Sequence, residues 1–322
     1  MSAERELLRR LQAGPVSGDA LARDAGLTRA AMWKRIEALR EAGVRIDARA
    51  GRGYALAGPL DLLDAGTIGQ ALDPGCRDGL AALEVAWSLD STNSELLRRD
   101  TPSQGVSALL AEQQTGGRGR RGRRWASPVA ANLYLSLARH FSGGLARLGG
   151  LSLVTGVAVA EALRALGFAG TGLKWPNDLV VDGRKLGGVL VEGGGEHGGP
   201  VRAIIGIGIN VRMPATFAAG IDQPWIDLAA LGGTAPDRNA LAAALLSHLL
   251  PALDRFDRDG LAPFLPRFAS LDVLAGREVA IHGARQTRHG VAGGLAEDGA
   301  LRVLIDGAWE NVHAGEISVR AQ

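Results

Sequence analysis

The sequence has little cysteine and no histidine cluster, and both shortages exclude classes of protein. Cys76 is the single cysteine of the chain, so no internal disulfide and no cysteine-based zinc site can form. The six histidines show no HExxH or similarly tight spacing, which excludes the usual histidine-based zinc motifs. We therefore predict a protein without a dedicated metal site.

The hydrophobicity pattern of the sequence also predicts neither a membrane-spanning segment nor a secretory leader. The most apolar stretch, residues 148–163, is short for a span and carries Glu161. The first residues show no basic-then-apolar leader pattern. Hydrophobic residues make up 46% of the chain and the net charge is only +2, which excludes a disordered chain and a polycation. We expect a globular, cytoplasmic protein with no membrane partner.

Lysine is scarce as well. Only three lysines, Lys34, Lys174 and Lys185, occur among 36 basic residues. Where arginine is the default cation, a lysine hints that a compact ammonium group is needed. Chance is the alternative explanation for so small a number.

Residues 1–60 are predicted to form a winged helix-turn-helix domain. Helical spacing covers 4–11, 17–25 and 29–41, and a basic hairpin follows with strands at 44–48 and 54–56. In this motif the second helix of the pair enters the major groove and the wing lies near phosphates. The residues expected to contact DNA are Thr28, Arg29, Lys34, Arg49 and Arg52. The alternative is a small helical docking domain without nucleic acid.

The rest of the chain divides after the likely connecting segment Gly58-Pro59-Leu60 into two further domains. In residues 61–270 strands and helices mix without βαβ alternation, which predicts an α+β domain with a mixed sheet. Its main helices are predicted at 151–166 and 239–256, and the glycine-rich residues 193–199 are predicted to form a hairpin tip. Residues 271–322 contain short strands and tight turns, which predict a small β-barrel.

A run of alternating glycine and arginine, residues 113–125, is the most unusual segment. Glycine raises the entropic cost of ordering it, but lets backbone N–H groups approach an anion, and arginine matches carboxylate and phosphate geometry. The pattern favours a lid over an anionic ligand. The alternative is a basic surface loop or a nucleic-acid-binding tail.

Three further motifs contain polar or glycine residues where strands end. Asp90–Asn93 follows a strand and is predicted to open a helix over 94–99, where it can hold a polar ring or an anion, or serve as a simple N-cap. The hairpin turn Asp182-Gly183 brings Lys185 beside Asp178, either as part of a site or as an ordinary cross-strand ion pair. Glycines in Gly206–Asn210 indicate close approach of a ligand, or a bulge.

Taken together, these motifs resemble those of the bifunctional biotin–protein ligase and biotin-operon repressor family. The resemblance implies a class II synthetase-like ligase domain and a C-terminal SH3-like barrel, with the winged helix as the repressor domain. The matching stretches occur in the family's order, and they are Asp90–Asn93, Gly117–Trp125, Ser127-Pro128, Asn132–Tyr134, Lys174–Asp178, Arg184–Gly188, Gly206–Asn210, Trp225-Ile226 and Gly315–Ser318.

The resemblance also implies a reaction and roles for residues. Biotin and ATP form biotinyl-5′-adenylate, and a lysine of the biotin carboxyl carrier protein of acetyl-CoA carboxylase then receives the biotin. Lys185, Arg118, Arg120 and Asp178 are the implied catalytic residues, with Lys185 bridging carboxylate and α-phosphate. Implied binding residues are Ser91, Thr92, Asn93 and Gln114 for biotin, Arg118, Gly119 and Arg120 for the lid, and Asn177, Asn210 and Trp225 for the adenine.

Mg²⁺ bound through phosphates, operator DNA and a homodimer of the adenylate-loaded form are implied in the same way. One position departs from the family: Ala130 stands where a glycine is usual, and a positive φ there would strain the chain. Three alternatives remain, namely a lipoate–protein ligase, a ligase with vestigial DNA binding, and a biotin-sensing transcription factor that does not ligate.

Overall fold

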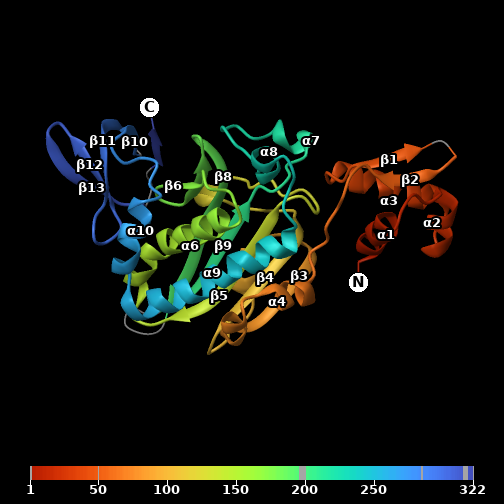
Figure 1. The fold of residues 1–322 in the computed structure, drawn as a ribbon, viewed down its shortest axis with the longest axis horizontal. Helices are drawn as coiled ribbons and strands as arrows, with labels where there is room; N and C mark the ends of the chain where they lie inside the picture. Colours follow the sequence, from red (N-terminus) through yellow and green to blue (C-terminus); the bar gives the residue numbers. More distant parts are fainter. Residues whose placement is uncertain (1, 50, 196–200, 284–285, 315–317, 322) are drawn as a thin grey trace.

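The computed structural model describes residues 2–49, 51–195, 201–283, 286–314 and 318–321. Its elements fall into three groups along the chain, with the N-terminal and C-terminal groups on opposite sides of the central one (Figure 1). Within the predicted hairpin tip, residues 193–195 end a strand and residues 196–199 lie outside the described residues. The matched segment Gly315–Ser318 also lies outside them, except for Ser318.

The N-terminal group is a helix-turn-helix with a two-stranded wing, as predicted. Each helix starts at a short hydroxyl residue, Ser2, Ser17 or Thr28, whose side chain accepts a hydrogen bond from an N–H of the first turn. Met32 and Ile36 are buried on the inner face of the third helix. The elements are α1 (Ala3–Gln12), α2 (Gly18–Asp24), α3 (Arg29–Glu41), β1 (Ile46–Arg49) and β2 (Gly53–Leu56).

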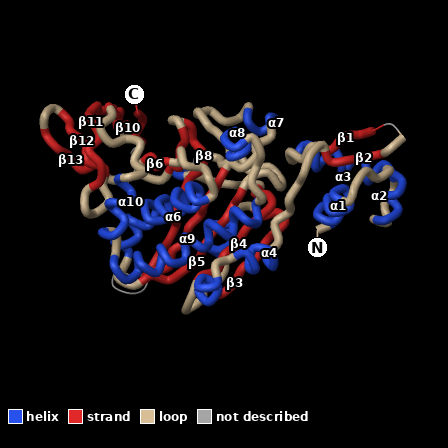
Figure 2. The backbone as a smooth tube through the Cα atoms, viewed as in Figure 1, coloured by secondary structure: helices blue, strands red, loops and turns tan. Residues whose placement is uncertain are grey.

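A seven-stranded mixed sheet forms the centre of the molecule (Figure 2). Its strand order is β3-β4-β5-β9-β8-β7-β6, and only β3 and β4 pair in parallel. This confirms the mixed sheet predicted from the sequence. The strands are β3 (Leu80–Leu89), β4 (Val106–Gln114), β5 (Leu133–Phe141), β6 (Gly172–Lys174), β7 (Asp178–Val181), β8 (Arg184–Gly195) and β9 (Val201–Ile209).

Two long helices, α6 (Leu151–Ala165) and α9 (Arg238–Asp259), cover one face of this sheet (Figure 1). The other face carries α5 (Thr92–Arg98), and the two faces separate along β4, where Leu110 belongs to the large core and Leu109 packs with Leu96. The predicted start of α5 at Ser94 was wrong, because Ser91 caps the helix and helical geometry begins at Thr92.

One stretch, Leu148–Ala165, is apolar and long enough to cross a membrane, but 67% of it is buried inside the structure. Glu161 within it forms an ion pair with Arg267 of α10 (Leu265–Ala269), so its charge is compensated inside the folded domain.

Short elements that the sequence pattern did not predict connect these layers. They lack the length over which a hydrophobic period can be recognised. They are α4 (Ala65–Ala71), η1 (Pro74–Gly79), η2 (Arg120–Gly122), η3 (Leu145–Gly150), α7 (Ala215–Ala218), α8 (Leu228–Gly232), η4 (Ala262–Phe264) and α10 (Leu265–Ala269).

The C-terminal group is a five-stranded antiparallel sheet in the order β13-β12-β11-β10-β14. It joins the central domain through the buried Trp175, whose Nε1 donates to the Gly299 carbonyl at 3.0 Å. Its strands are β10 (Glu278–His282), β11 (Thr287–Leu295), β12 (Leu301–Ile305), β13 (Ala308–Val312) and β14 (Ser318–Ala321).

The segment between the N-terminal group and the sheet is anchored along its length. Glu112 on β4 is fully buried, accepts the Leu63 N–H at 2.6 Å and lies 2.9 Å from the guanidinium of buried Arg238. Arg238 also contacts Asp61, at 3.5 Å between Nε and Oδ1. The predicted connecting segment is therefore followed by an internal ion-pair network that ties it to the sheet.

We expect Glu112→Ala to lower the free energy of unfolding by about 3–5 kcal/mol, because it removes the fully buried carboxylate beside Arg238 and leaves that buried charge with the longer contact to Asp61. Urea denaturation measures the loss. Asp24→Ala is the control, since it removes an exposed pair with Arg10 and should cost less than about 1 kcal/mol. Equal losses in the two variants would contradict this reading of the network.

Candidate active site

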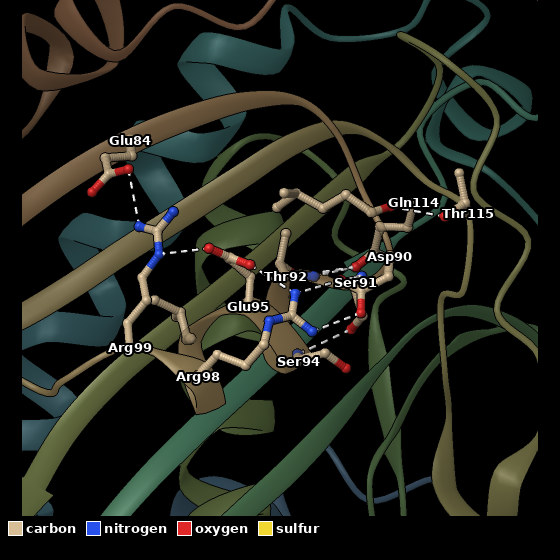
Figure 3. Close-up of polar contacts among 12 residues, drawn as sticks. Glu84, Asp90, Ser91, Thr92, Ser94, Glu95, Arg98, Arg99, Gln114 and Thr115 are labelled. Atoms are coloured by element: carbon tan, nitrogen blue, oxygen red, sulfur yellow. Dashed lines mark hydrogen bonds and ion pairs between the residues drawn. The ribbon is translucent and has the colours of Figure 1, made fainter.

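Polar side chains converge where β4 ends and α5 begins. Gln114, at the end of β4, accepts from the Thr92 N–H at 2.8 Å and from the Thr92 hydroxyl at 3.1 Å. Its own Nε2 donates to Ser127 Oγ at 3.3 Å. Figure 3 shows Gln114 lying over Ser91 and Thr92 from the neighbouring strand. Three of the residues expected to bind biotin are thus brought together.

Asn93, the fourth of these residues, is buried beside the glycines of β9. Its Oδ1 accepts from Ser136 Oγ at 2.6 Å, and its Nδ2 donates to Glu192 at 2.8 Å. A Cβ on Gly206 would lie 2.4 Å from Asn93 Oδ1, so this strand position requires glycine. The close approach at Gly206 is therefore made by a side chain of the protein itself, not by the ligand that the sequence led us to expect.

The glycine–arginine segment closes on itself as a compact loop next to these residues. The Gly119 N–H donates to Arg123 O at 2.7 Å, and the Trp125 N–H donates to Gly117 O at 2.9 Å. A Cβ on Gly117 would lie 2.7 Å from Ser127 Oγ, so the loop folds tightly against the Gln114 side. After β4 ends at Gln114, the η2 turn and one antiparallel bridge between Arg118 and Arg124 are the regular structure of residues 115–125, in line with the glycine-rich composition.

Arg118 and Arg120 of the lid have different hydrogen-bond partners. Arg118 contacts Ser94 Oγ at 2.9 Å and the carboxylate of Glu192 at 3.2 Å. Arg120 donates to Asn177 Oδ1 at 3.3 Å and also to the main-chain carbonyl of Ala314. Burial lowers the pKa of the Arg120 guanidinium. The lid is thereby attached both to the sheet and to the C-terminal group.

Lys185 and Asp178 form an ion pair on the β7–β8 hairpin, as the sequence predicts. Lys185 Nζ lies 2.6 Å from Asp178 Oδ1, and both side chains are about four-fifths buried. The same ammonium lies 5.6 Å from the ring centroid of Trp125, within range of a cation–π interaction. This places a partly dehydrated cation beneath the end of the lid.

Trp125 packs flat against the backbone of β9. A Cβ on Gly208 would lie 2.6 Å from its ring, and its buried Nε1 has no hydrogen-bond partner among the described residues. A buried donor without a partner is rare and marks a place where a ligand acceptor can bind. Gly208 therefore leaves the room on β9 that the Trp125 ring occupies.

The three residues expected near the adenine are not equivalent. Asn177 bonds Val189 O through Nδ2 at 2.8 Å and faces Arg120 through Oδ1. Asn210 is buried, and its Nδ2 donates to Ile226 O at 3.1 Å. Trp225 pairs with Lys185 in a short parallel bridge. Asn210 thus holds the 225–226 segment beside the lysine.

Ala130, where the sequence departs from the family, has a positive φ of 52°, as anticipated. Its N–H donates to Glu112 O at 3.0 Å, and the preceding Val129 N–H donates to Ala42 O of the N-terminal group at 2.9 Å. The strained residue thus lies where the segment after the lid contacts the winged helix.

The sequence motifs did not identify Ser136, Glu192 or Trp125 as site residues. Ser136 and Glu192 lie inside strands, and only the pairing of β5, β9 and β8 brings them to Asn93. Trp125 stands within a matched stretch, but nothing in its spacing shows that it packs on Gly208. No group of three or more metal-ligating side chains occurs among the described residues.

The residues expected to contact DNA lie on the surface of the N-terminal group. Arg29, Lys34, Arg49 and Arg52 are exposed, and Arg29 forms only a loose pair with Asp19 at 3.7 Å. Thr28 caps α3 by accepting the Ala31 N–H at 3.2 Å. The first turn of α3 has no acidic residue, so this surface is positive where a groove would be entered.

Comparisons with known proteins agree with this arrangement. Residues 85–210 match the Biotin/lipoate A/B protein ligase family, and residues 4–55 match an HTH domain. The bifunctional ligase/repressor BirA of Salmonella typhimurium is 43% identical over 305 residues, which are 95% of this chain and 93% of that protein. The biotin--[acetyl-CoA-carboxylase] ligase of Mycobacterium tuberculosis is 32% identical over 250 residues, which are 76% of this chain and 91% of that protein.

A solved structure is similar as well. The biotin protein ligase from Aquifex aeolicus in complex with biotin and ATP gives a TM-score of 0.65 at 30% sequence identity. The match covers 76% of this chain and 99% of that chain.

Asp90 gives a pH-dependent prediction. Hydrogen bonds from Arg98 lower the pKa of its carboxyl from 3.8 to about 2, so the stability that the pair contributes is present above pH 3.8 and is lost as the pH falls toward 2. Because both side chains are about half exposed, this contribution is small. We expect NMR titration of the Asp90 carboxyl carbon to give a midpoint of about 2, and a midpoint near 3.8 in Arg98→Ala. An unchanged midpoint in the variant would show that Arg98 does not cause the shift.

Proposed function

Because the chain belongs to the family of bifunctional biotin ligase/repressors, we propose that it joins biotin to ATP as biotinyl-5′-adenylate and passes the biotin to a lysine of an acceptor protein. Identity of 43% across nearly the whole of a family member supports this activity. The observation that carries the chemistry is the cluster of Lys185, Asp178 and Trp125 beneath a lid that contains Arg118 and Arg120.

The biotin side of the site is proposed to be the Ser91–Asn93 turn with Gln114. Asn93 and Thr92 are buried and share the Ser136 hydroxyl, so their polar atoms have fixed positions. Fixed donors and acceptors can recognise a small polar ring without reorganising. Gly119 joins Arg118 and Arg120 in extended geometry, and these two arginines are proposed to cover the carboxylate and the phosphate.

The reaction brings together two anions, a carboxylate and an α-phosphate. Their repulsion and the charge that develops on the phosphoryl oxygens are offset best by cations already held in place in a site with little water. Lys185 meets both conditions, since Asp178 fixes its ammonium group and Trp125 covers it. We assign it to the bridge between carboxylate and α-phosphate, with Arg118 and Arg120 as further cations.

Asp178 and the adenine side complete the proposal. When Lys185 turns to the phosphate, Asp178 is left to receive either the acceptor's ammonium group or a magnesium-bound phosphate. Asn177, Asn210 and Trp225 are proposed to contact the adenine, with Asn210 acting through the 225–226 segment that it holds. Mg²⁺ enters with ATP as part of the substrate, which suits a site in which the described residues form no group of three or more metal-ligating side chains.

The N-terminal group is proposed to bind operator DNA through Thr28, Arg29, Lys34, Arg49 and Arg52. The HTH match and the exposed cations support this. A biotin carboxyl carrier protein of acetyl-CoA carboxylase is the proposed acceptor, and a homodimer is the proposed DNA-binding form when the adenylate is bound. Such a protein acts in the cytoplasm.

We also propose the domain boundaries and the fold of each domain. Residues 1–60 form the winged helix, residues 61–270 a class II synthetase-like ligase domain, and residues 271–322 an SH3-like barrel. The sheet orders and the family membership support these boundaries. A lipoate–protein ligase is disfavoured because relatives that align over nearly the whole chain are ligase/repressors.

We expect Lys185→Ala to slow adenylate formation by roughly 10²–10³-fold, because it removes a preorganised cation from the reacting anions. Rapid quench with mass-spectrometric detection of the adenylate, using biotin and MgATP with lipoate as a comparison, measures the rate. Arg184→Ala is the matched control, because Arg184 precedes the lysine on the same strand and pairs only loosely with Asp182, at 3.6 Å. Normal rates in Lys185→Ala would refute the role of the lysine.

We expect Lys34→Ala to weaken operator binding uniformly and to reduce the slope of log K against log salt by about 1, because it removes one phosphate contact. Fluorescence anisotropy at several salt concentrations gives the slope. Arg77→Ala, on the central domain and away from the winged helix, is the control. An unchanged slope in Lys34→Ala would remove this lysine from the phosphate contacts.

A further inference from the structure

A chain of ion pairs runs along α5 beside the proposed biotin residues (Figure 3). Arg98 contacts both oxygens of Asp90, each at 2.8 Å, and also Glu95 at 2.7 Å. Arg99 contacts Glu95 at 2.9 Å and Glu84 of the edge strand β3 at 3.0 Å. The two neighbouring arginines share one acid, but only Arg98 reaches Asp90 in the described contacts.

Asp90 makes contacts in two further directions. Its Oδ1 accepts the Ser91 N–H at 2.8 Å, at the start of the polar turn. Its main-chain carbonyl accepts the Gly116 N–H at 2.8 Å, and the preceding Leu89 carbonyl accepts the Thr115 N–H at 2.8 Å. Thr115 and Gly116 lead directly into the lid. One residue therefore connects the biotin turn, the first residues of the lid and Arg98.

The turn that depends on Asp90 has little freedom of its own. Ser91, Thr92 and Asn93 are each less than 5% exposed, so a small rotation of the backbone at Asp90 shifts three buried polar side chains together. A two-point contact between guanidinium and carboxylate fixes direction as well as distance. The low pKa of the Asp90 carboxyl, which Arg98 causes, agrees with a persistent pair.

We propose that Arg98 is a positioning residue for biotin, which by holding Asp90 sets both the Ser91–Asn93 turn and the attachment point of the lid. This inference rests on the proposed ligase function. Arg98 and Asp90 are about half exposed, so the pair adds little to global stability. Its effect is local, on the geometry of groups that contact the ligand, and is therefore expected in substrate affinity.

The test compares Arg98→Ala with Arg99→Ala in the full-length protein. Both variants remove one arginine and one bond to Glu95 from the same helix end, but only the first releases Asp90. We expect Arg98→Ala to raise the KM for biotin about threefold to fivefold with kcat nearly unchanged, as the loss of one exposed charge pair allows. Arg99→Ala should leave the KM within about 1.5-fold of wild type.

Two additional variants separate positioning from folding. Asp90→Asn should raise the biotin KM as Arg98→Ala does, while Arg98→Lys, which keeps the charge but not the two-point contact, should recover only part of the affinity. Thermal unfolding of all four variants should show midpoints close to wild type. Calorimetric titration with biotin in the absence of ATP measures the dissociation constant directly, and it should rank the variants in the same order as the KM values.

The outcomes are distinct. Equal biotin KM values in Arg98→Ala and Arg99→Ala, with wild type active, would overturn the positioning role and leave the ligase function standing. A loss of kcat in Arg98→Ala without a change in KM would also overturn it. A wild-type protein that neither binds biotin nor forms the adenylate would refute the proposed function and this inference together.

Discussion

The site depends on the contact between Lys185 and Asp178. An ammonium group at the edge of a protein interior is costly unless a carboxylate holds it, and the β7–β8 hairpin provides that carboxylate at 2.6 Å. Three neighbouring residues help to position the pair. Asn210 secures the segment that bridges to Lys185, Gly208 leaves room for the indole, and Trp125 covers the cation.

Hydrogen bonds attach the lid to the C-terminal group and the segment after the lid to the N-terminal group. Arg120 reaches the C-terminal group at Ala314, and Val129, just after the lid, donates to Ala42 at the end of α3. Gly43 allows this approach, because a Cβ there would lie 2.9 Å from Pro128. The buried Glu112–Arg238 pair anchors the connecting segment, so the three groups of elements share one framework around the site.

Much of this could be predicted from the sequence because its signals are local. The winged helix follows from three stretches of helical spacing and a basic hairpin, and the Lys185–Asp178 pair follows from one Asp-Gly turn. Ser136 and Glu192 could not be predicted, since they depend on the pairing of strands distant in the sequence. The predicted start of α5 was also wrong. The four polar residues Asp90–Asn93 were all placed before the helix, but Ser91 is the N-cap and the helix begins at Thr92.

The most direct test is a crystal structure of the protein with biotinyl-5′-adenylate, in which the distances from Lys185 Nζ to the ligand and to Asp178 are measured. If fixed cations offset the repulsion between the two substrates, the ammonium group will lie within hydrogen-bonding distance of the acyl–phosphate linkage, and the lid arginines will face the same atoms. A structure in which Lys185 remains on Asp178 and the arginines point into solvent, with the ligand bound elsewhere, would contradict the proposed mechanism.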